Sequence, residues 1–84
     1  MSKKDKLVAR LQKRPNDFTW NELTSLLKSL GYTEVRTGKT GGSRRRFIHQ
    51  NAPTLSLHKP HPQNIIKRYA IDQVLHVLRQ EDLI

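Results

Sequence analysis

The chain has 84 residues, enough for one small domain with a modest core and too few for two. Sixteen Lys and Arg against seven Asp and Glu give a formal net charge of +9, which favours polyanionic partners, nucleic acid first and anionic lipid second. Cysteine is absent, which excludes disulfides and thiolate metal sites and fits the reducing cytoplasm, and no apolar run is long enough for a membrane span or a secretory signal.

Residues 3–14 are predicted to form a first helix. Leu7, Val8 and Leu11 recur at helical spacing, and Pro15 ends the segment because its ring obstructs continuation. The segment is basic, but its apolar face is too small for binding at a membrane surface. We therefore expect residues 1–16 to form an N-terminal extension that docks on the domain or lies free, and residues 17–84 to form the domain itself.

Residues 20–30 are predicted to form a second helix. Thr19 and Glu22 have the spacing of a capping box, in which each residue satisfies a backbone amide of the first turn. An apolar stripe with a period near 3.6 follows: Trp20, Leu23, Leu26, Leu27 and Leu30. Gly31 is a natural place for the helix to stop.

Three strands are predicted next, at residues 32–37, 44–49 and 54–58, from their alternation and their β-branched and aromatic residues. A turn at 39–43 contains Gly41-Gly42, and a loop at 50–53 joins the second and third strands. A last helix at 69–81 has an apolar face and places Asp72 in its first turn. The order α-α-β-β-β-α predicts an α+β two-layer sandwich, with an antiparallel meander covered by helices on one face.

The strongest local signal is the run Arg44-Arg45-Arg46 at the start of the second strand. Residues 31–70 carry eight basic residues and one acid, Glu34. The guanidinium group of arginine can donate two parallel hydrogen bonds to one phosphate, so this run predicts a site for a polyanion. Successive strand residues face opposite ways, so at least one arginine must lie at the core rim or leave the sheet edge. Phe47 and Ile48, which follow the arginines, are both apolar and face opposite ways. The alternation of this strand therefore does not decide which of its faces is buried in the core.

Other chemistries find little support. Gly38-Lys39-Thr40 resembles the end of a phosphate-binding loop, but the glycine required five residues earlier is Thr33 and no helix follows, so we exclude nucleoside triphosphate binding. The four histidines lack metal-ligand spacing, and no metal ion or cofactor is expected. No orienting acid accompanies Ser43, which makes a nucleophile pair with a histidine improbable.

The segments "GGSRRRFIH" and "LSLHKPHP", followed by an amphipathic helix, resemble the HicA toxin family of bacterial toxin–antitoxin modules. The resemblance runs from about Phe18 to the C-terminus and rests on Gly42-Ser43, Phe47, His49 and Pro60-His61-Pro62. It implies a double-stranded-RNA-binding-like α-β-β-β-α fold with an added N-terminal helix. It also implies a metal-independent endoribonuclease that cleaves mRNA and blocks translation, with a HicB-type antitoxin as partner.

One position departs from the family pattern. The family's catalytic histidine directly follows Gly-Ser, where this chain has Arg44, and an arginine stays protonated and cannot act as a general base. Arg44 could hold the scissile phosphate and stabilise its charge. The base would then be His61, His49 or His58, and the sequence does not choose between them. The residues expected to contact RNA are Lys39, Ser43, Arg44, Arg45, Arg46 and Lys59.

Two other functions stay open. One is a non-catalytic RNA-binding domain with the same fold, which the missing histidine favours. The other is a protein-interaction domain whose basic face meets an acidic partner, and this overlaps with the toxin because a toxin must also bind its antitoxin.

Overall fold

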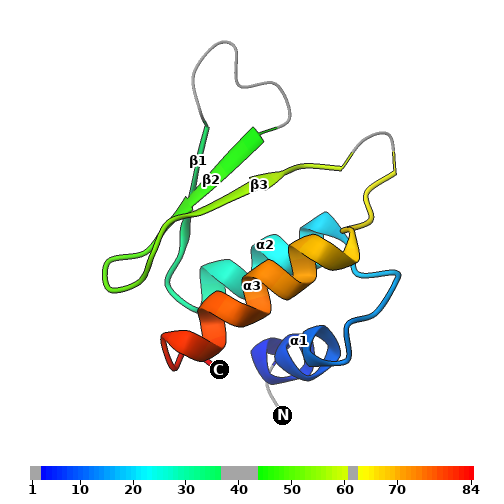
Figure 1. The fold of residues 1–84 in the computed structure, drawn as a ribbon, viewed down its shortest axis with the longest axis horizontal. Coiled ribbons are helices and arrows are strands. Elements are labelled where there is room, and N and C mark those ends of the chain that lie inside the picture. The colour runs from blue at the N-terminus through cyan, green and yellow to red at the C-terminus, as the bar shows by residue number, and fades with distance from the viewer. Residues whose placement is uncertain (1–2, 37–43, 61–62) are drawn as a thin grey trace.

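A computed structural model of the chain describes residues 3–36, 44–60 and 63–84 (Figure 1). The elements in chain order are α1 (Lys3–Gln12), α2 (Trp20–Ser29), β1 (Thr33–Arg36), β2 (Arg44–Ile48), β3 (Leu55–His58) and α3 (Arg68–Gln80). The predicted order and the α+β class are confirmed. The predicted turn at 39–43 lies outside the described residues.

The three strands form one antiparallel sheet in the order β1-β2-β3. Phe47, Leu55 and Leu57 are buried on one face, while the residues between them in the strands are exposed or half-buried. Phe47 therefore belongs to the core, and Ile48 lies on the opposite face with 43% of its surface exposed. Contacts with residues distant in the sequence therefore determine which face of β2 is buried, which the alternation within β2 alone could not.

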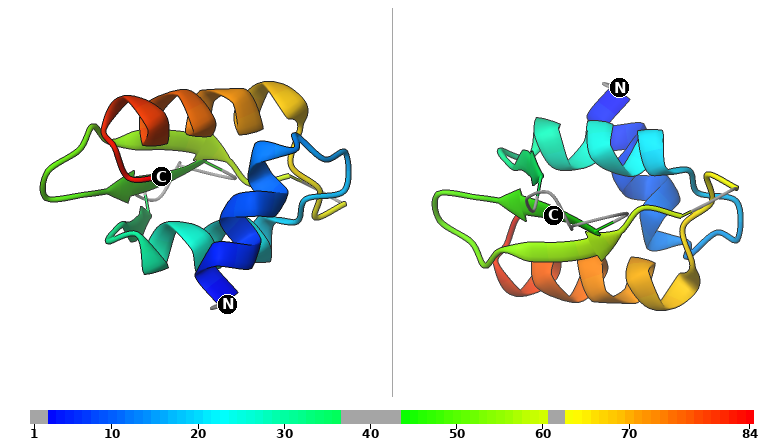
Figure 2. Two further views of the ribbon diagram at one scale, coloured as in Figure 1. Left: turned by 90° about the horizontal axis from the view of Figure 1, so that it is seen from below. Right: turned by 90° about the horizontal axis from the view of Figure 1, so that it is seen from above.

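Helices α2 and α3 cover the buried face of the sheet. Figure 1 shows both below the strands, and Figure 2 shows them along opposite sides of the molecule when it is seen from below. The Trp20 ring of α2 meets the Phe47 ring of β2 with centroids 5.7 Å apart. The helices and the sheet thus form two layers around one core, as predicted and as in the double-stranded-RNA-binding-like fold.

The limits of α2 follow from its sequence. The Thr19 side chain accepts a hydrogen bond from the Glu22 backbone amide, and the Glu22 carboxylate accepts one from the Thr19 amide, which confirms the capping box. At the other end Gly31 has a φ of +101°, a left-handed conformation that side chains rarely adopt. Both ends of the helix are therefore encoded locally.

Helix α1 packs on the helical layer from the side away from the sheet, against α2 and α3 (Figures 1 and 2). Leu7 and Leu11 are buried in the same apolar cluster as the residues of α2, α3 and the sheet. Of the two arrangements expected for this segment, docking on the domain is the one observed. The helix ends at Gln12, two residues before the predicted end, and Arg14 has a φ of 51° just before Pro15.

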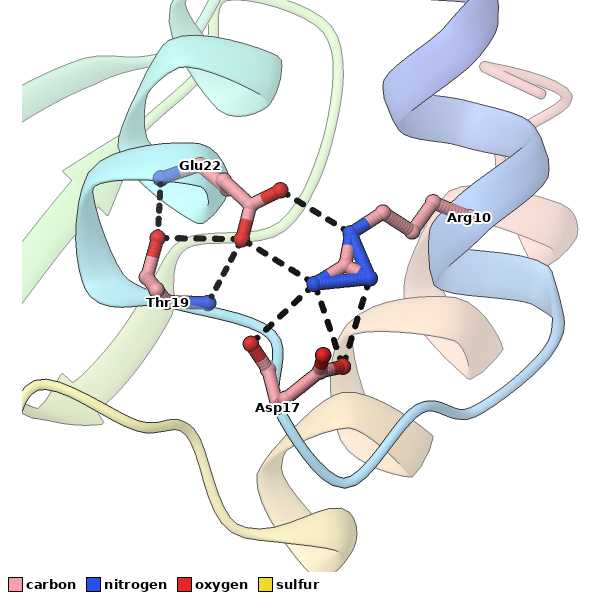
Figure 3. A network of polar contacts seen from close by, with 4 residues as sticks. All are labelled: Arg10, Asp17, Thr19 and Glu22. Carbon is pink, nitrogen blue, oxygen red and sulfur yellow. Dashed lines mark hydrogen bonds and ion pairs between the residues drawn. The ribbon is translucent and has the colours of Figure 1, made fainter.

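Two arginines join this N-terminal segment to the helical layer, and Figure 3 shows the contacts of the first, Arg10. Arg10 donates to the Glu22 carboxylate at 2.9 Å and to the Asp17 carboxylate at 3.1 Å, so it ties α1 to the capping box of α2. Arg14 binds Asp72 of α3 through two guanidinium nitrogens, one of them at 2.9 Å. The pKa of Arg14 is raised by its hydrogen bond to Asp72 and by the carboxylate charge.

The role predicted for Asp72 is wrong. Helix α3 begins at Arg68, one residue earlier than predicted, and its first turn has no acidic residue. Asp72 therefore lies beyond the first turn, where the field of the helix terminus is weak. Its partner is Arg14, which is 58 residues away in the sequence, so no local pattern could have indicated the pair.

Candidate nucleic-acid interface

The face of the sheet that the helices leave uncovered carries three of the predicted site residues that the structure describes, Arg44, Arg46 and His58. Its exposed side chains are Thr33, Val35, Arg44, Arg46, Ile48, Ser56 and His58. We call this surface the open face. It combines two arginines and a histidine with two apolar side chains, and no acidic residue is among them.

Arg44 and His58 are directly opposite each other on the open face. They are paired in the register of β2 and β3, and both side chains are exposed. Directly opposite residues of an antiparallel pair have Cβ atoms about 4.5–5.5 Å apart, close enough for both side chains to reach one phosphate group. Lys59 follows His58 and is also exposed. The sheet thus brings together three residues predicted to act on RNA.

Arg45 lies on the other face of the sheet. Only 19% of its side chain is exposed, and its Nε is 3.5 Å from the Glu34 carboxylate on β1. The prediction that one of the three arginines lies at the rim of the core is therefore confirmed. Arg44 and Arg46 remain on the open face, with Arg45 between them along β2.

His49 is held by contacts at the opposite end of β2 from Arg44. Its Nδ1 accepts a hydrogen bond from the Asn51 amide at 2.9 Å, so its Nε2 carries the proton and donates to the Leu30 carbonyl at 3.0 Å. Its ring packs on the Tyr32 ring with centroids 4.9 Å apart. Neither nitrogen can take a proton from RNA without losing a protein hydrogen bond, and the ring instead closes the C-terminal end of α2.

Lys39, Ser43 and His61 lie outside the described residues. His76 is exposed on α3.

A groove lies between β3 and the start of α3, next to the open face. Its volume is about 810 Å³, and it shares Ser56 and His58 with the open face. We define it by six residues, Ser56, Leu57, Ile66, Tyr69, Ala70 and Gln73, and call it the β3–α3 groove. Sequence reasoning did not predict it, because its two walls are separated by about a dozen residues and meet only in the fold. The lack of any acid between Glu34 and Asp72 was the one available signal.

The part of the chain that the structure describes contains neither a metal centre nor a membrane-spanning helix. In residues 3–36, 44–60 and 63–84, no three His, Cys, Asp or Glu side chains are grouped so that they could hold a metal ion. Within the same ranges, none of the helices has the length and apolar character needed to cross a membrane.

Comparison with known proteins assigns the family. A sequence model described as the HicA toxin of bacterial toxin–antitoxin systems matches residues 20–80, which is more than half of the chain. No curated protein and no solved structure gave a significant match. The match begins at α2 and ends with α3, and the three helices and three-stranded sheet are compatible with the double-stranded-RNA-binding-like fold of that family. The chain therefore belongs to the HicA toxin family of bacterial toxin–antitoxin systems.

Proposed function

We propose that this toxin is a metal-independent endoribonuclease that cleaves mRNA and so blocks translation, with Arg44 and His58 at the reaction centre. The observation that carries the proposal is the cross-strand pair itself. Arg44 occupies the position of the family's catalytic histidine, and the residue opposite it on the next strand is a histidine.

In this proposal His58 takes the proton of the RNA 2′-OH as the 2′-oxygen attacks the adjacent phosphorus. The P–O bond to the 5′-oxygen breaks, and a 2′,3′-cyclic phosphate and a 5′-hydroxyl result. Arg44 donates two hydrogen bonds to the phosphate oxygens and stabilises the charge that develops there. Imidazole is suited to proton transfer near neutral pH, whereas a guanidinium stays protonated. The leaving oxygen also needs a proton, for which His61 is the remaining candidate.

The other basic residues have different roles. We propose that Arg46 and Lys59, both exposed beside the pair, bind neighbouring phosphates together with Lys39 and Ser43. Arg45 acts indirectly, because its ion pair with Glu34 holds β1 against β2. His49 is not placed in the reaction, since both of its ring nitrogens bind the protein.

We further propose that a HicB-type antitoxin with an acidic surface covers the open face in the cytoplasm and thereby blocks access of RNA. The exposed Val35 and Ile48 support this, because they add apolar area among the positive charges. Interfaces that bury such mixed surfaces gain from both burial and charge complementarity. No cofactor is needed for the proposed reaction.

The test is RNA cleavage in the presence of EDTA by wild type, His58→Ala and His76→Ala. His76 is a matched control, because it is an exposed histidine on α3 away from the open face. Loss of a general base costs about 10²–10⁴-fold in rate, so we expect such a loss for His58→Ala and no change for His76→Ala. Equal rates for the three proteins would refute the assignment of His58.

The alternative function is RNA binding without cleavage. It is favoured by the arginine at the family's catalytic position, since Arg44 can hold a phosphate but cannot remove a proton. Salt-dependent RNA binding by wild type, together with intact RNA after long incubation in EDTA, would establish this alternative and reject the ribonuclease.

A further inference from the structure

The β3–α3 groove has the size of a site for a small ligand. Pockets for such molecules are commonly about 300–1,000 Å³, and this one has about 810 Å³. Its walls come from the outer side of β3, which ends the sheet order β1-β2-β3, and from the first two turns of α3. It opens beside His58, so a ligand in it would lie next to the Arg44–His58 pair.

The lining of the groove has three kinds of groups. Leu57 and Ile66 are buried and give it an apolar base. Gln73 offers an amide that can both donate and accept hydrogen bonds, and Tyr69 offers a phenol ring that is 64% exposed. The charged lining residues are all basic: Lys59, Lys67 and Arg68.

This combination matches the chemistry of a nucleotide. A nucleobase has an apolar face that stacks on aromatic rings and a polar edge that an amide can bind, and its phosphates attract lysine and arginine. A base can enter such a groove only when it is unpaired, because the edges and faces of a paired base are occupied in the duplex.

We propose that the β3–α3 groove binds one unpaired nucleotide of the RNA next to the phosphate held by Arg44 and His58. The inference rests on the proposed function and narrows its substrate to single-stranded or splayed RNA. Tyr69 stacks on the base and Gln73 binds its edge. The groove thus selects which nucleotide lies next to the cleaved bond. The open face supplies contacts to phosphates, and these carry no sequence information.

A peptide strand added to the outer side of β3 is the competing occupant. We favour the nucleotide because β3 has four residues and offers few backbone hydrogen bonds, whereas the aromatic, amide and basic groups each match one part of a nucleotide.

The first test is an NMR titration of the whole chain with adenosine, guanosine, cytidine and uridine 5′-monophosphates, and separately with inorganic phosphate. We expect at least one nucleotide to shift the Tyr69 and Gln73 amides saturably and to bind more tightly than phosphate. Tyr69→Ala should weaken that binding by about 5-fold or more, since a stacked base contributes about 1–3 kcal/mol. Gln73→Ala should also weaken it, while Gln80→Ala should not, because Gln80 is an exposed glutamine at the end of α3 that does not line the groove.

Phosphate binding as tightly as every nucleotide would overturn the inference, as would unchanged nucleotide binding in both groove variants. Displacement of the nucleotide by an acidic peptide that pairs with β3 in the same spectra would reassign the groove to a protein partner and also overturn it. This titration is independent of cleavage, so it tests the groove even if the ribonuclease proposal fails.

The second test is the pattern of RNA cleavage. We expect wild type to cut single-stranded segments of a hairpin RNA, and Tyr69→Ala to lose preference among these sites through a raised KM. Cleavage with an unchanged pattern and KM in Tyr69→Ala and Gln73→Ala would remove the groove from recognition while leaving the ribonuclease intact.

Discussion

Replacing Leu11 with alanine tests whether α1 is part of the folded unit or an extension of it. Leu11 is fully buried, and the cluster around it includes residues of α2 and α3. Leucine-to-alanine changes at such sites lower the free energy of unfolding by about 2–5 kcal/mol. The transfer free energy of the removed side-chain atoms is lost, and the cavity left behind adds a further cost. A domain of 84 residues has a total stability of about 4–13 kcal/mol, so the change removes a large share of it.

The assay is urea and thermal unfolding of wild type, Leu11→Ala and Gln12→Ala. A loss of about 3 kcal/mol lowers Tm by about 12–24 °C in a domain of this size, with an unchanged m-value if unfolding stays two-state. Gln12 is the exposed neighbour on the same helix and should tolerate alanine. A loss below about 0.5 kcal/mol for Leu11→Ala would refute the reasoning and support the predicted division into residues 1–16 and 17–84.

Three further outcomes are expected. Gly31→Ala should lower the free energy of unfolding by about 1–2 kcal/mol or more in urea titration, because φ is +101° and the new Cβ would lie 2.9 Å from Nε2 of His49; an unchanged midpoint would contradict this. Burial, and less strongly Glu81, raises the pKa of Tyr32 above its ordinary 10.0, so the folded state keeps the phenol proton longer than the unfolded chain and stability falls as pH rises above about 10. Tyr32→Phe should show a smaller fall than wild type between about pH 8 and pH 11, and parallel curves would reject the assignment. Arg46→Ala should reduce the slope of log affinity against log salt for RNA by about 0.7–0.9 if it binds one phosphate, while the exposed Arg79→Ala on α3 should leave the slope unchanged.

The parts of the fold that the sequence predicted well are those with local causes. The ends of α2 come from a capping box and a glycine, and both lie within four residues of the helix. The strands of the meander follow from alternation and turns, and their register then fixes which residues face each other. The docking of α1 depended on contacts with distant helices, so the sequence left it open.

The candidate site shows the same limit more sharply. His49 and His58 look alike in the sequence, since each ends a predicted strand near basic residues. The fold separates them because His49 meets Gly31 and the end of α2, whereas His58 lies on the open face opposite Arg44. A residue's chemistry is visible in the sequence, but whether its nitrogens are already bound depends on segments 19 residues away.

The pairing of Arg44 with His58 also gives a physical reason why the loss of the family's histidine need not remove the chemistry. Directly opposite positions in an antiparallel sheet hold their side chains over the same point of its surface. In the proposed reaction, a base on β3 and a phosphate-binding arginine on β2 can therefore reach the same phosphate. The fold must therefore keep the register between β2 and β3. The buried side chains of Phe47 and Leu55 keep it fixed, because a slip of one residue would turn one of the two toward solvent.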